Sequence, residues 1–309
     1  MIKIHLDTDL GGDIDDMCAL ALLLRWPGDI QITGITTVAD INGRRAGYVR
    51  YVLGLEGSNE IPVKAGAEAS QGFYRYKMSL PPEDRYWPEP VAPSPNAPDE
   101  AIHLLKASIE QEAIIIGIGP YTNLYLLDLQ YPGILMDARL FLMGGYVFPP
   151  RPGFPNWRND IDFNIQADVK SAKHVFQNSK PTLIPLSMTI ETALRRAYLE
   201  NLRKSGALGQ LIAHQAEAFA VDEKFETRFG ATCPGLPLDI INFQHDPLAC
   251  AIALGWNEGV EIQELPLIVE EKEGWLTESI HPSGRPTRIV TKVDGSRFSE
   301  YWLKILANN

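Results

Sequence analysis

Cysteine is scarce in this chain: only Cys18, Cys233 and Cys250 occur among 309 residues. Their number is odd, their spacing matches no metal-ligand pattern, and two of them lie in apolar runs, so we expect buried free thiols. No histidine cluster accompanies them. The sequence therefore excludes a tetrahedral zinc site built from cysteine and histidine.

Positive charge is also in short supply, because 28 lysines and arginines oppose 39 aspartates and glutamates and leave a net charge of −11. Such a surface cannot neutralise phosphates, which argues against nucleic acid and anionic membranes as partners. No apolar run is long enough to span a bilayer, and no charged leader with an apolar core precedes Ile2. We expect a cytoplasmic protein that binds a small neutral or cationic molecule.

The composition is that of an ordinary globular protein, with 45% hydrophobic and 22% charged residues. Strand-like and helix-like segments alternate along the chain, which predicts βαβ crossovers. We expect one α/β domain over residues 1–309, with a mainly parallel, Rossmann-like central sheet flanked by helices. The expected strands are 1–6, 30–38, 61–66, 113–118, 139–143, 181–188, 261–270 and 287–293, the last two antiparallel and peripheral, and the expected helices include 17–24, 44–55, 99–112 and 298–307.

One turn concentrates negative charge: Asp7, Asp9, Asp13, Asp15 and Asp16 fall within ten residues, directly after the first expected strand. Carboxylates this close raise one another's pKa and repel, so proteins that keep them pair them with hydrogen-bond donors or a metal ion. The turn follows the carboxyl end of a strand, where open parallel sheets bind ligands. The sequence therefore predicts a site in this acidic turn.

Two plainer interpretations of the acidic turn compete with a ligand site. Aspartates before a helix can act only as N-caps and partners of the helix dipole, and Asp15 or Asp16 alone would fit that role. Capping needs one or two such residues, whereas this turn has five. A calcium loop of the EF-hand type fails on spacing, because counting from Asp7 puts Gly11 fifth and Cys18 twelfth, where ligands belong.

Polar residues also follow later expected strands, in segments 39–43, 119–124 and 160–168. Residues 160–168 alternate polar and apolar, and if this segment is extended, Asp162 and Asn164 share one side. Further on, His245 and Asp246 open an apolar helix. A histidine beside a helix start is more often structural than catalytic, but its neighbour Asp246 favours a role in the site.

Together these motifs resemble the inosine-uridine preferring nucleoside hydrolases. The resemblance rests on Asp-Thr-Asp-Leu-Gly at 7–11 with the two aspartates at 15 and 16, and on the motifs at 119–123, 142–145, 162–164 and 245–247. Their order and spacing match along almost the whole chain. The resemblance implies the nucleoside hydrolase fold and a calcium-dependent enzyme of purine or pyrimidine salvage that splits ribonucleosides into free base and ribose. It also implies a homo-oligomer, either a dimer or a tetramer.

The resemblance assigns a catalytic and metal-binding set to this sequence. Asp9 would be the base that activates water, and it would also contact the metal ion. Asp16, the carbonyl of Thr122 and Asp246 would complete the calcium shell. His245 looks like the histidine that assists the leaving group.

The resemblance also assigns a sugar-binding set. Asp15 and Asn164 would hold ribose hydroxyls. Asn42, Asn156 and Asp162 resemble the other sugar-binding positions of the family. A small-molecule nucleoside is therefore the expected partner.

The sequence departs from the family pattern at three places. Two extra residues separate Asp9 from Asp15, which leaves open whether Asp13 takes over the role of a neighbour at the metal or the sugar. Asp162 stands where glutamate is usual. Segment 73–98 lacks the glycine-rich loop with histidine that many members carry.

Chemistry favours the same assignment without the family. Breaking a C–N glycosidic bond passes through an oxocarbenium-like sugar, which needs a nearby anion, a positioned water and stabilisation of the departing base. A hard cation held by carboxylates and a carbonyl orients that water and lowers its pKa. An all-oxygen ligand set indicates calcium rather than zinc.

Two other functions remain open from the sequence. A haloacid-dehalogenase-like phosphatase also carries Asp-x-Asp after its first strand, with magnesium and an aspartyl-phosphate intermediate. Here Leu10 and Gly11 follow Asp9, and no later lysine with a matching acidic pair is evident. The other alternative is a catalytically inactive ligand-binding protein on the same fold, which turnover of a nucleoside with calcium would separate from an enzyme.

Two proline-rich segments, 73–98 and 146–157, follow strand ends on the active face. Aromatic rings in such segments can stack on a planar base, so we expect both to form a rim that reads the leaving group. A packed surface loop is the other interpretation of 73–98. The candidate rings are Tyr74, Tyr76, Tyr86, Trp87 and Trp157, with His245 and residues 225–229 as the next place to look.

Overall fold

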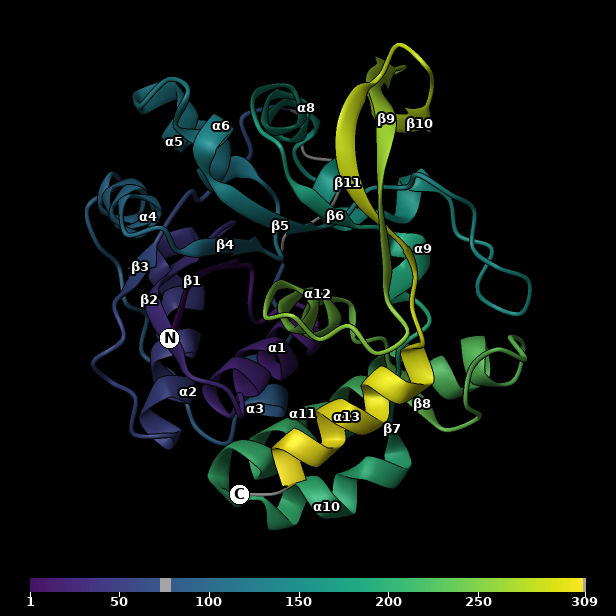
Figure 1. Ribbon diagram of the computed structural model, residues 1–309. Coiled ribbons are helices and arrows are strands. Elements are labelled where there is room, and N and C mark those ends of the chain that lie inside the picture. The colour runs from purple at the N-terminus through teal and green to yellow at the C-terminus, as the bar shows by residue number, and fades with distance from the viewer. Residues whose placement is uncertain (73–78, 308–309) are drawn as a thin grey trace.

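The computed structural model describes residues 1–72 and 79–307. Within these residues nine strands form one sheet, in the order β10-β9-β11-β6-β5-β4-β1-β2-β3 (Figure 1). The strands are β1 (Ile2–Thr8), β2 (Ile30–Thr37), β3 (Val63–Ala65), β4 (Ile114–Gly117), β5 (Arg139–Met143), β6 (Thr182–Ile184), β9 (Glu261–Lys272), β10 (Trp275–Ile280) and β11 (Arg285–Lys292). A separate small sheet pairs β7 (Leu194–Arg195) with β8 (Ile240–Asn242).

The sheet changes its direction of growth at β1. Strands β2 and β3 are added on one side of β1, and β4, β5 and β6 are added on the other side, all in parallel. The carboxyl ends of β1 and β4 therefore lie side by side at a topological switch point, where open α/β sheets bind ligands. The register pairs Asp7 with Gly117, so the chain leaves both strands at the same level, toward Asp9 and Gly119.

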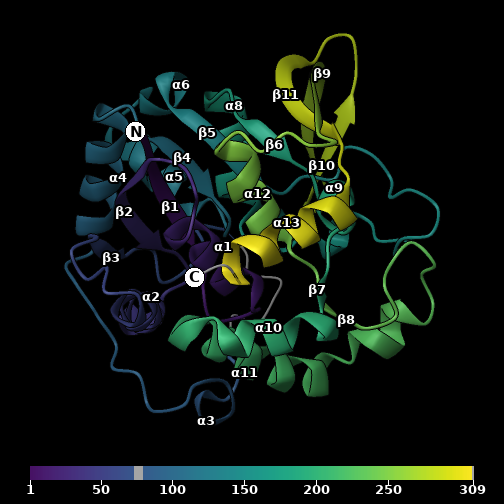
Figure 2. The same cartoon turned by 60° about the horizontal axis from the view of Figure 1, so that its bottom comes forward.

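Helices cover both faces of the sheet, which a mainly parallel sheet requires. One face packs against α1 (Asp15–Leu24), α2 (Arg44–Leu55), α12 (His245–Ala253) and α13 (Gly295–Ala307), and the other against α4 (Glu100–Glu110), α5 (Thr122–Gln130) and α8 (Val169–Asn178). Figure 1 shows these two groups below and above the sheet, and Figure 2 shows α10 (Leu199–Lys204) and α11 (Gly206–Glu223) packed below α1 and α13. The short helices are α3 (Glu83–Tyr86), α6 (Ile134–Asp137), α7 (Phe163–Gln166) and α9 (Leu186–Thr189).

Helix α1 lies in the core and is buried on all sides. From Met17 to Leu23 no residue is more than 1% exposed. The indole of Trp302 on α13 donates a hydrogen bond to the carbonyl of Cys18 at 3.1 Å. Because α1 is clamped by apolar packing, its N-terminal turn, which carries Asp15 and Asp16, is held in a fixed place.

The structure confirms the predicted single α/β domain with a mainly parallel sheet, and helix 44–55 and strand 139–143 have the predicted bounds. The antiparallel placement of 261–270 is also confirmed, since β9 pairs antiparallel with β10 and β11. Strand 287–293 is not peripheral, however, because β11 pairs in parallel with β6 and extends the main sheet. Among the described helices, none combines the length and the apolar composition that crossing a membrane requires.

Two segments fold differently from the prediction. Segment 160–168 is not extended, because Asp162 accepts a hydrogen bond from the N–H of Ile165 at 3.3 Å and so caps the short helix α7. The strand expected over 181–188 ends at Ile184, and Pro185 then precedes the one-turn helix α9. Both differences arise from local capping and turn chemistry that the apolar pattern does not reveal.

Candidate active site

The site begins where β1 and β4 end. Asp9 follows β1 and is 9% exposed. A Cβ atom added to Gly119, just beyond β4, would lie 2.8 Å from Oδ1 of Asp9 and 2.8 Å from Val38. A side chain at 119 would therefore displace the Asp9 carboxylate, and glycine is required at this close approach.

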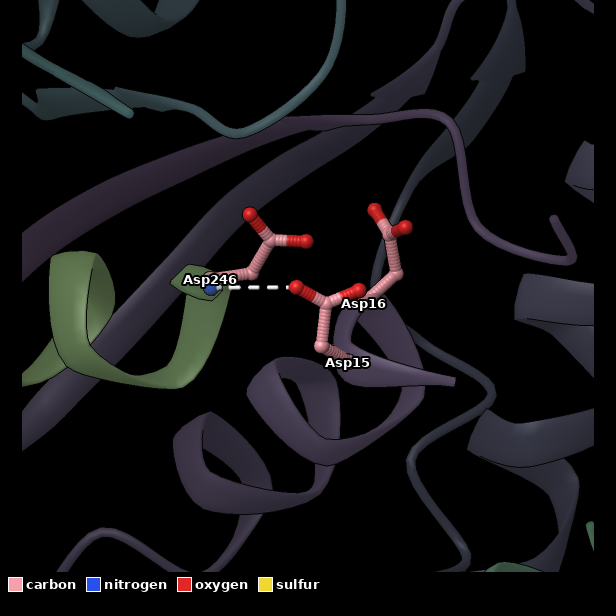
Figure 3. A group of neighbouring side chains, drawn as sticks. All are labelled: Asp15, Asp16 and Asp246. Carbon is pink, nitrogen blue, oxygen red and sulfur yellow. Dashed lines mark hydrogen bonds between the residues drawn. The ribbon is translucent and has the colours of Figure 1, made fainter. Parts of the chain in front are cut away.

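Three further carboxylates converge beside Asp9. Asp15 and Asp16 project from the first turn of α1, and Asp246 projects from the first turn of α12 (Figure 3). One carboxylate oxygen from each of the three lies within 4.8 Å of the others. All three residues are buried, at 4–5% exposure. Two helix N-termini thus bring their positive dipole ends and their acidic side chains to one point.

These buried carboxylates are poorly compensated by protein donors. Desolvation, and then repulsion between the aspartates, raises the pKa of Asp15 and of Asp246 well above the usual range. Desolvation and the charge of Asp9 do the same to the pKa of Asp16, although the hydroxyl of Thr8 donates a hydrogen bond to it. The backbone N–H of Asp246 donates to Asp15 at 3.4 Å. The side chain of Asp246 accepts no hydrogen bond in the part of the chain that the structure describes.

A cavity of about 350 Å³ opens over this cluster. Its wall includes most of the residues that the sequence assigned to the site. These are Asp9, Asp15, Asp16, Trp157, Asp162, Asn164, His245 and Asp246, together with Asp13. The structure therefore gathers segments more than 200 residues apart around one hollow at the switch point.

Asp13 lies at the cavity wall but is not one of the three clustered carboxylates. Its Oδ1 accepts hydrogen bonds from the N–H groups of Ile14 and Asp15, the latter at 3.2 Å, and from the amide of Asn242. These contacts cap the start of α1. The capping role that the sequence allowed for Asp15 or Asp16 thus falls to Asp13, whereas Asp15 and Asp16 belong to the clustered carboxylates.

We expect Asp13→Ala to lower the free energy of unfolding by about 1 kcal/mol, the usual cost of losing a helix cap. Its affinity for calcium should remain that of the wild type, because Asp13 lies outside the clustered carboxylates. Urea unfolding and calorimetric titration check the two parts. A large loss of calcium affinity would instead place Asp13 in the metal shell.

Asp162 and Asn164 are held by backbone groups. Asp162 accepts hydrogen bonds from the N–H of Gly145 at 2.5 Å and from the N–H of Ile165. Burial raises the pKa of Asp162 to about 7, although these two bonds act to lower it. The Nδ2 of Asn164 donates to the carbonyls of Ile118 at 2.9 Å and Met143 at 3.2 Å. Because both bonds use Nδ2, the Oδ1 atom of Asn164 is the one left to accept a hydrogen bond from a ligand.

His245 lines the cavity beside two aromatic rings. Its ring centroid lies 5.3 Å from that of Phe243 and 6.4 Å from that of Trp157. Desolvation lowers the pKa of His245 to about 3, so the imidazole is neutral at pH 7. Its Nδ1 lies 2.7 Å from the hydroxyl of Thr189, which also reaches the carbonyl of Leu186 at 3.1 Å. The direction in which Thr189 donates its single proton decides which ring nitrogen carries hydrogen.

Thr122 stands at the N-terminus of α5, behind the cavity wall. Its hydroxyl donates to Asp168 at 2.7 Å, and Asp168 also accepts from the N–H of Gln71 at 2.9 Å and from Ser171. Asp168, which the sequence reasoning missed, therefore fixes both Thr122 and the start of the segment that leads into 73–98. The hydroxyl proton of Thr122 is used by Asp168, and the carbonyl of Thr122 stays the predicted metal ligand.

Besides Thr122, four described residues assigned from the sequence are not brought to the cavity wall. Asn42 is exposed in a turn with φ of 56° and lies at a different hollow, and Asn156 is exposed next to Trp157. Tyr86 and Trp87 are each 4% exposed and belong to the core, where Trp87 stacks on Tyr48 with ring centroids 4.2 Å apart. Tyr74 and Tyr76 lie outside the described residues. Among residues 79–98, Ser79 lines the cavity.

One charged cavity residue was missed altogether. Arg45, in the first turn of α2, is 3% exposed and lines the cavity. Its charge opposes the rise in the pKa of Asp9. The available signal was its position directly after the turn at 39–43, which ends a parallel strand on the active face.

Comparison with known proteins agrees with this geometry. A family model described as inosine-uridine preferring nucleoside hydrolase matches residues 4–300. The chain belongs to this family. It is an N-glycosidase of the nucleoside hydrolase class. The family match excludes the phosphatase alternative.

Curated relatives of this nucleoside hydrolase cover nearly the whole chain. The pyrimidine-specific ribonucleoside hydrolase RihA of Salmonella arizonae is 29% identical, and RihA of Citrobacter koseri is 27% identical. Each alignment covers 95% of this chain and 88% of the relative. Solved structures share the fold: a plant nucleoside hydrolase, PpNRh1, matches with a TM-score of 0.78 at 18% identity, covering 100% of this chain and 99% of that one. A purine-preferring ribonucleoside hydrolase from Gardnerella vaginalis matches with a TM-score of 0.75 at 20% identity, covering 99% and 98%.

Proposed function

We propose that this nucleoside hydrolase splits ribonucleosides into free base and ribose, with a calcium ion held by the acidic cluster and Asp9 as the general base. The proposal is carried by the convergence of Asp15, Asp16 and Asp246 beside Asp9 in one cavity at the switch point. The cavity, about 350 Å³, falls at the lower end of the range of roughly 300–1,000 Å³ for ligand pockets and suits a single nucleoside.

The donor set fits a hard divalent cation. Asp9, Asp16, Asp246 and the carbonyl of Thr122 are all oxygen ligands, and Asp15 lies close enough to join them. A buried carboxylate such as Asp246, which receives no donor from the described residues, is costly unless a cation compensates it. Calcium accepts several carboxylate and carbonyl oxygens in a flexible geometry. Bound here, the ion would orient a water molecule and lower its pKa.

The protein's own groups supply the remaining chemistry. Asp9 takes a proton from the water as its oxygen adds to C1′ of the ribose. The C–N bond breaks, and its electron pair passes to the departing base. Asp15 and the Oδ1 of Asn164 accept hydrogen bonds from ribose hydroxyls and hold the sugar in place. Asp162, tied to Gly145, fixes the loop that carries Asn164 and keeps one lone pair on each oxygen for the sugar.

His245 is placed to act on the leaving base. A neutral imidazole can donate a proton only from the ring nitrogen that carries hydrogen. If the hydroxyl of Thr189 donates to Nδ1, then Nδ1 is the acceptor and Nε2 carries the ring proton. Thr189 thus orients the histidine in addition to contacting it. Asn42 and Asn156, which the resemblance assigns to the sugar, do not line the cavity, and their contact with the sugar stays a prediction.

A substrate panel tests the proposed function. Purine and pyrimidine ribonucleosides and ribosylated pyridines are incubated with the purified protein and calcium, and free ribose is measured. Release of ribose from at least one nucleoside supports an enzyme. Tight binding without release would indicate the alternative, an inactive ligand-binding member of the family.

We expect Trp157→Ala to change the ratio of kcat/KM between purine and pyrimidine nucleosides by roughly tenfold, because base stacking on an aromatic ring contributes about 1–3 kcal/mol. Trp157 lines the cavity and packs edge-on against Phe229 and Phe243 at 5.4 and 5.2 Å between centroids. Trp26→Ala, which removes a ring packed on Tyr301 away from the cavity, is the matched control. An unchanged ratio would assign base selection to other residues.

The homo-oligomer, dimer or tetramer, and the role in nucleoside salvage are proposed from the family resemblance alone. Light scattering of the purified protein measures the first. A monomer at micromolar concentration would contradict it.

A further inference from the structure

Arg45 carries donor atoms that the protein does not use. Asp40 fixes the backbone of Arg45 by accepting its N–H at 2.7 Å. The side chain then turns toward the acidic turn, where Nε donates to the carbonyl of Ala39 at 3.0 Å and Nη1 donates to the carbonyls of Asp9 and Leu10. The guanidinium thus ties the end of β2 to the end of β1.

A guanidinium has five N–H groups, and these three bonds account for the one on Nε and the two on Nη1. Both N–H groups of Nη2 lack an acceptor among residues 1–72 and 79–307, and within the same ranges Arg45 forms no ion pair with a carboxylate. The residue as a whole is 3% exposed, and it lines the cavity. Since Arg45 lines the cavity next to Gly12 and Ser79, a ligand in the cavity is the natural source of the missing acceptor.

The surroundings restrict the chemistry of that acceptor. The negative charge of the cavity exceeds the positive charge of one divalent ion and one guanidinium, because five aspartates line it: Asp9, Asp13, Asp15, Asp16 and Asp246. The cavity therefore repels a phosphate or a carboxylate. A neutral acceptor is therefore favoured. Ribose hydroxyls are donors to the carboxylates, whereas a carbonyl oxygen or an unprotonated ring nitrogen of the base can only accept.

We propose that Nη2 of Arg45 donates a hydrogen bond to an acceptor atom of the leaving base next to its glycosidic nitrogen, such as a pyrimidine carbonyl oxygen or a purine ring nitrogen. This inference rests on the proposed hydrolysis. As the C–N bond breaks, its electron pair moves onto the base, and negative charge grows on that acceptor. The bond to a permanent cation is then strongest in the transition state, which accelerates departure. The departing base takes a proton from Nε2 of His245, which regains one from solvent, while Asp9 retains the proton of the attacking water until it is released to solvent.

The test pairs a protein change with a substrate change. Adenosine is compared with 3-deazaadenosine, in which CH replaces the acceptor nitrogen, and uridine with 2-thiouridine, in which sulfur is the weaker acceptor. Arg45→Lys keeps a positive charge that can contact the carbonyls but removes Nη2. We expect Arg45→Lys to lower two ratios of kcat/KM, adenosine over 3-deazaadenosine and uridine over 2-thiouridine, by about 10- to 100-fold. This is the size of the contribution of a hydrogen bond to a charged group.

Arg25→Lys is the matched control, because Arg25 is also a buried guanidinium, bonded to Glu56 and to the carbonyl of Leu306, away from the cavity. It should keep the wild-type ratio. Calcium affinity and urea unfolding separate the base contact from a structural role. If Arg45→Lys lowers the rates of all substrates equally and weakens calcium binding in parallel, or if the ratio does not move, the assignment is overturned.

A binding measurement keeps the two proposals apart. Pseudouridine carries one carbonyl, at C4, next to the carbon of its C–C glycosidic bond, which the enzyme cannot hydrolyse. If the wild type releases ribose from no nucleoside, the proposed hydrolysis fails, and the dissociation constant for pseudouridine decides on Arg45. Weaker binding by Arg45→Lys but not by Arg25→Lys then supports the contact, and equal constants, or no binding by the wild type, reject it.

Discussion

Asp9→Asn should lower kcat by at least about a hundredfold, the lower range for loss of a general base. The substitution preserves the shape of the side chain against Gly119 and leaves an oxygen for the metal ion. The fold and calcium binding should therefore persist while the proton acceptor is lost. Steady-state release of ribose, together with urea unfolding and calorimetric titration of calcium, measures the three effects.

A surface change of the same chemistry provides the control for Asp9→Asn. Asp29 pairs with the N-terminal amino group at 3.0 Å and is largely exposed, so Asp29→Asn should leave turnover unchanged. Near-native turnover of Asp9→Asn would remove this carboxylate from the mechanism. Restoration of activity at higher pH, where hydroxide replaces the missing base, would add support.

The second large effect concerns the metal ion. Wild-type protein should bind one calcium per chain, and Asp246→Ala should weaken that binding by at least about a hundredfold, since even residues behind the ligands cost roughly 10- to 100-fold in metal affinity. Asp246 joins the cluster from α12, and the substitution removes only its carboxylate, because the backbone N–H of residue 246 still donates to Asp15. Asp29→Ala is the matched control, because it removes an exposed carboxylate that pairs with the N-terminal amino group. Equal calcium affinity in the two variants would show that Asp246 is not a ligand.

Removing calcium should also make stability depend on pH. The pKa values of Asp15, Asp16 and Asp246 are raised in the folded chain, so the metal-free native state binds more protons than the unfolded state. Its stability should therefore fall as pH rises above about 4 toward these raised values. Asp7 and Asp162, whose pKa values burial raises to about 7, contribute the same trend with or without metal. Urea unfolding at about pH 5.5 and pH 8, with calcium and with chelator, isolates the pH dependence of the free energy of unfolding that is due to the cluster. A chelated protein that is no less stable at the higher pH would contradict this prediction.

Much of the fold follows from local sequence. Helix 44–55 and strand 139–143 are bounded by clear turn residues. The acidic turn was recognisable because a strand, a glycine turn and an apolar helix follow one another. The strand β10 escaped prediction because it belongs to a hairpin whose outer positions are polar. Tyr86 and Trp87 were misplaced because their stacking in the core depends on Tyr48 and Asp222, which local sequence does not reveal.

The sequence predicted which segments form the site, but not how their side chains are arranged in space. The motifs located Asp9, Asn164, His245 and Asp246, all of which line the cavity. The tight group with Asp16 and Asp246 is completed by Asp15 and not by Asp9. This depends on how α1 packs against α12, a contact between residues more than 200 positions apart, which the sequence does not reveal. Arg45 looked like an ordinary helix arginine, because only the fold turns its guanidinium toward Asp9 and Leu10.

The most direct measurement is ribose release from one accepted nucleoside by protein first stripped with chelator and then titrated with calcium. We expect no measurable release from the stripped protein and recovery of full turnover at one calcium per chain. The Asp9→Asn variant, titrated in parallel, should bind calcium yet stay at least about a hundredfold slower. Full turnover by the stripped protein, with no further gain on adding calcium, would contradict a metal-dependent nucleoside hydrolase built on Asp9, Asp16 and Asp246.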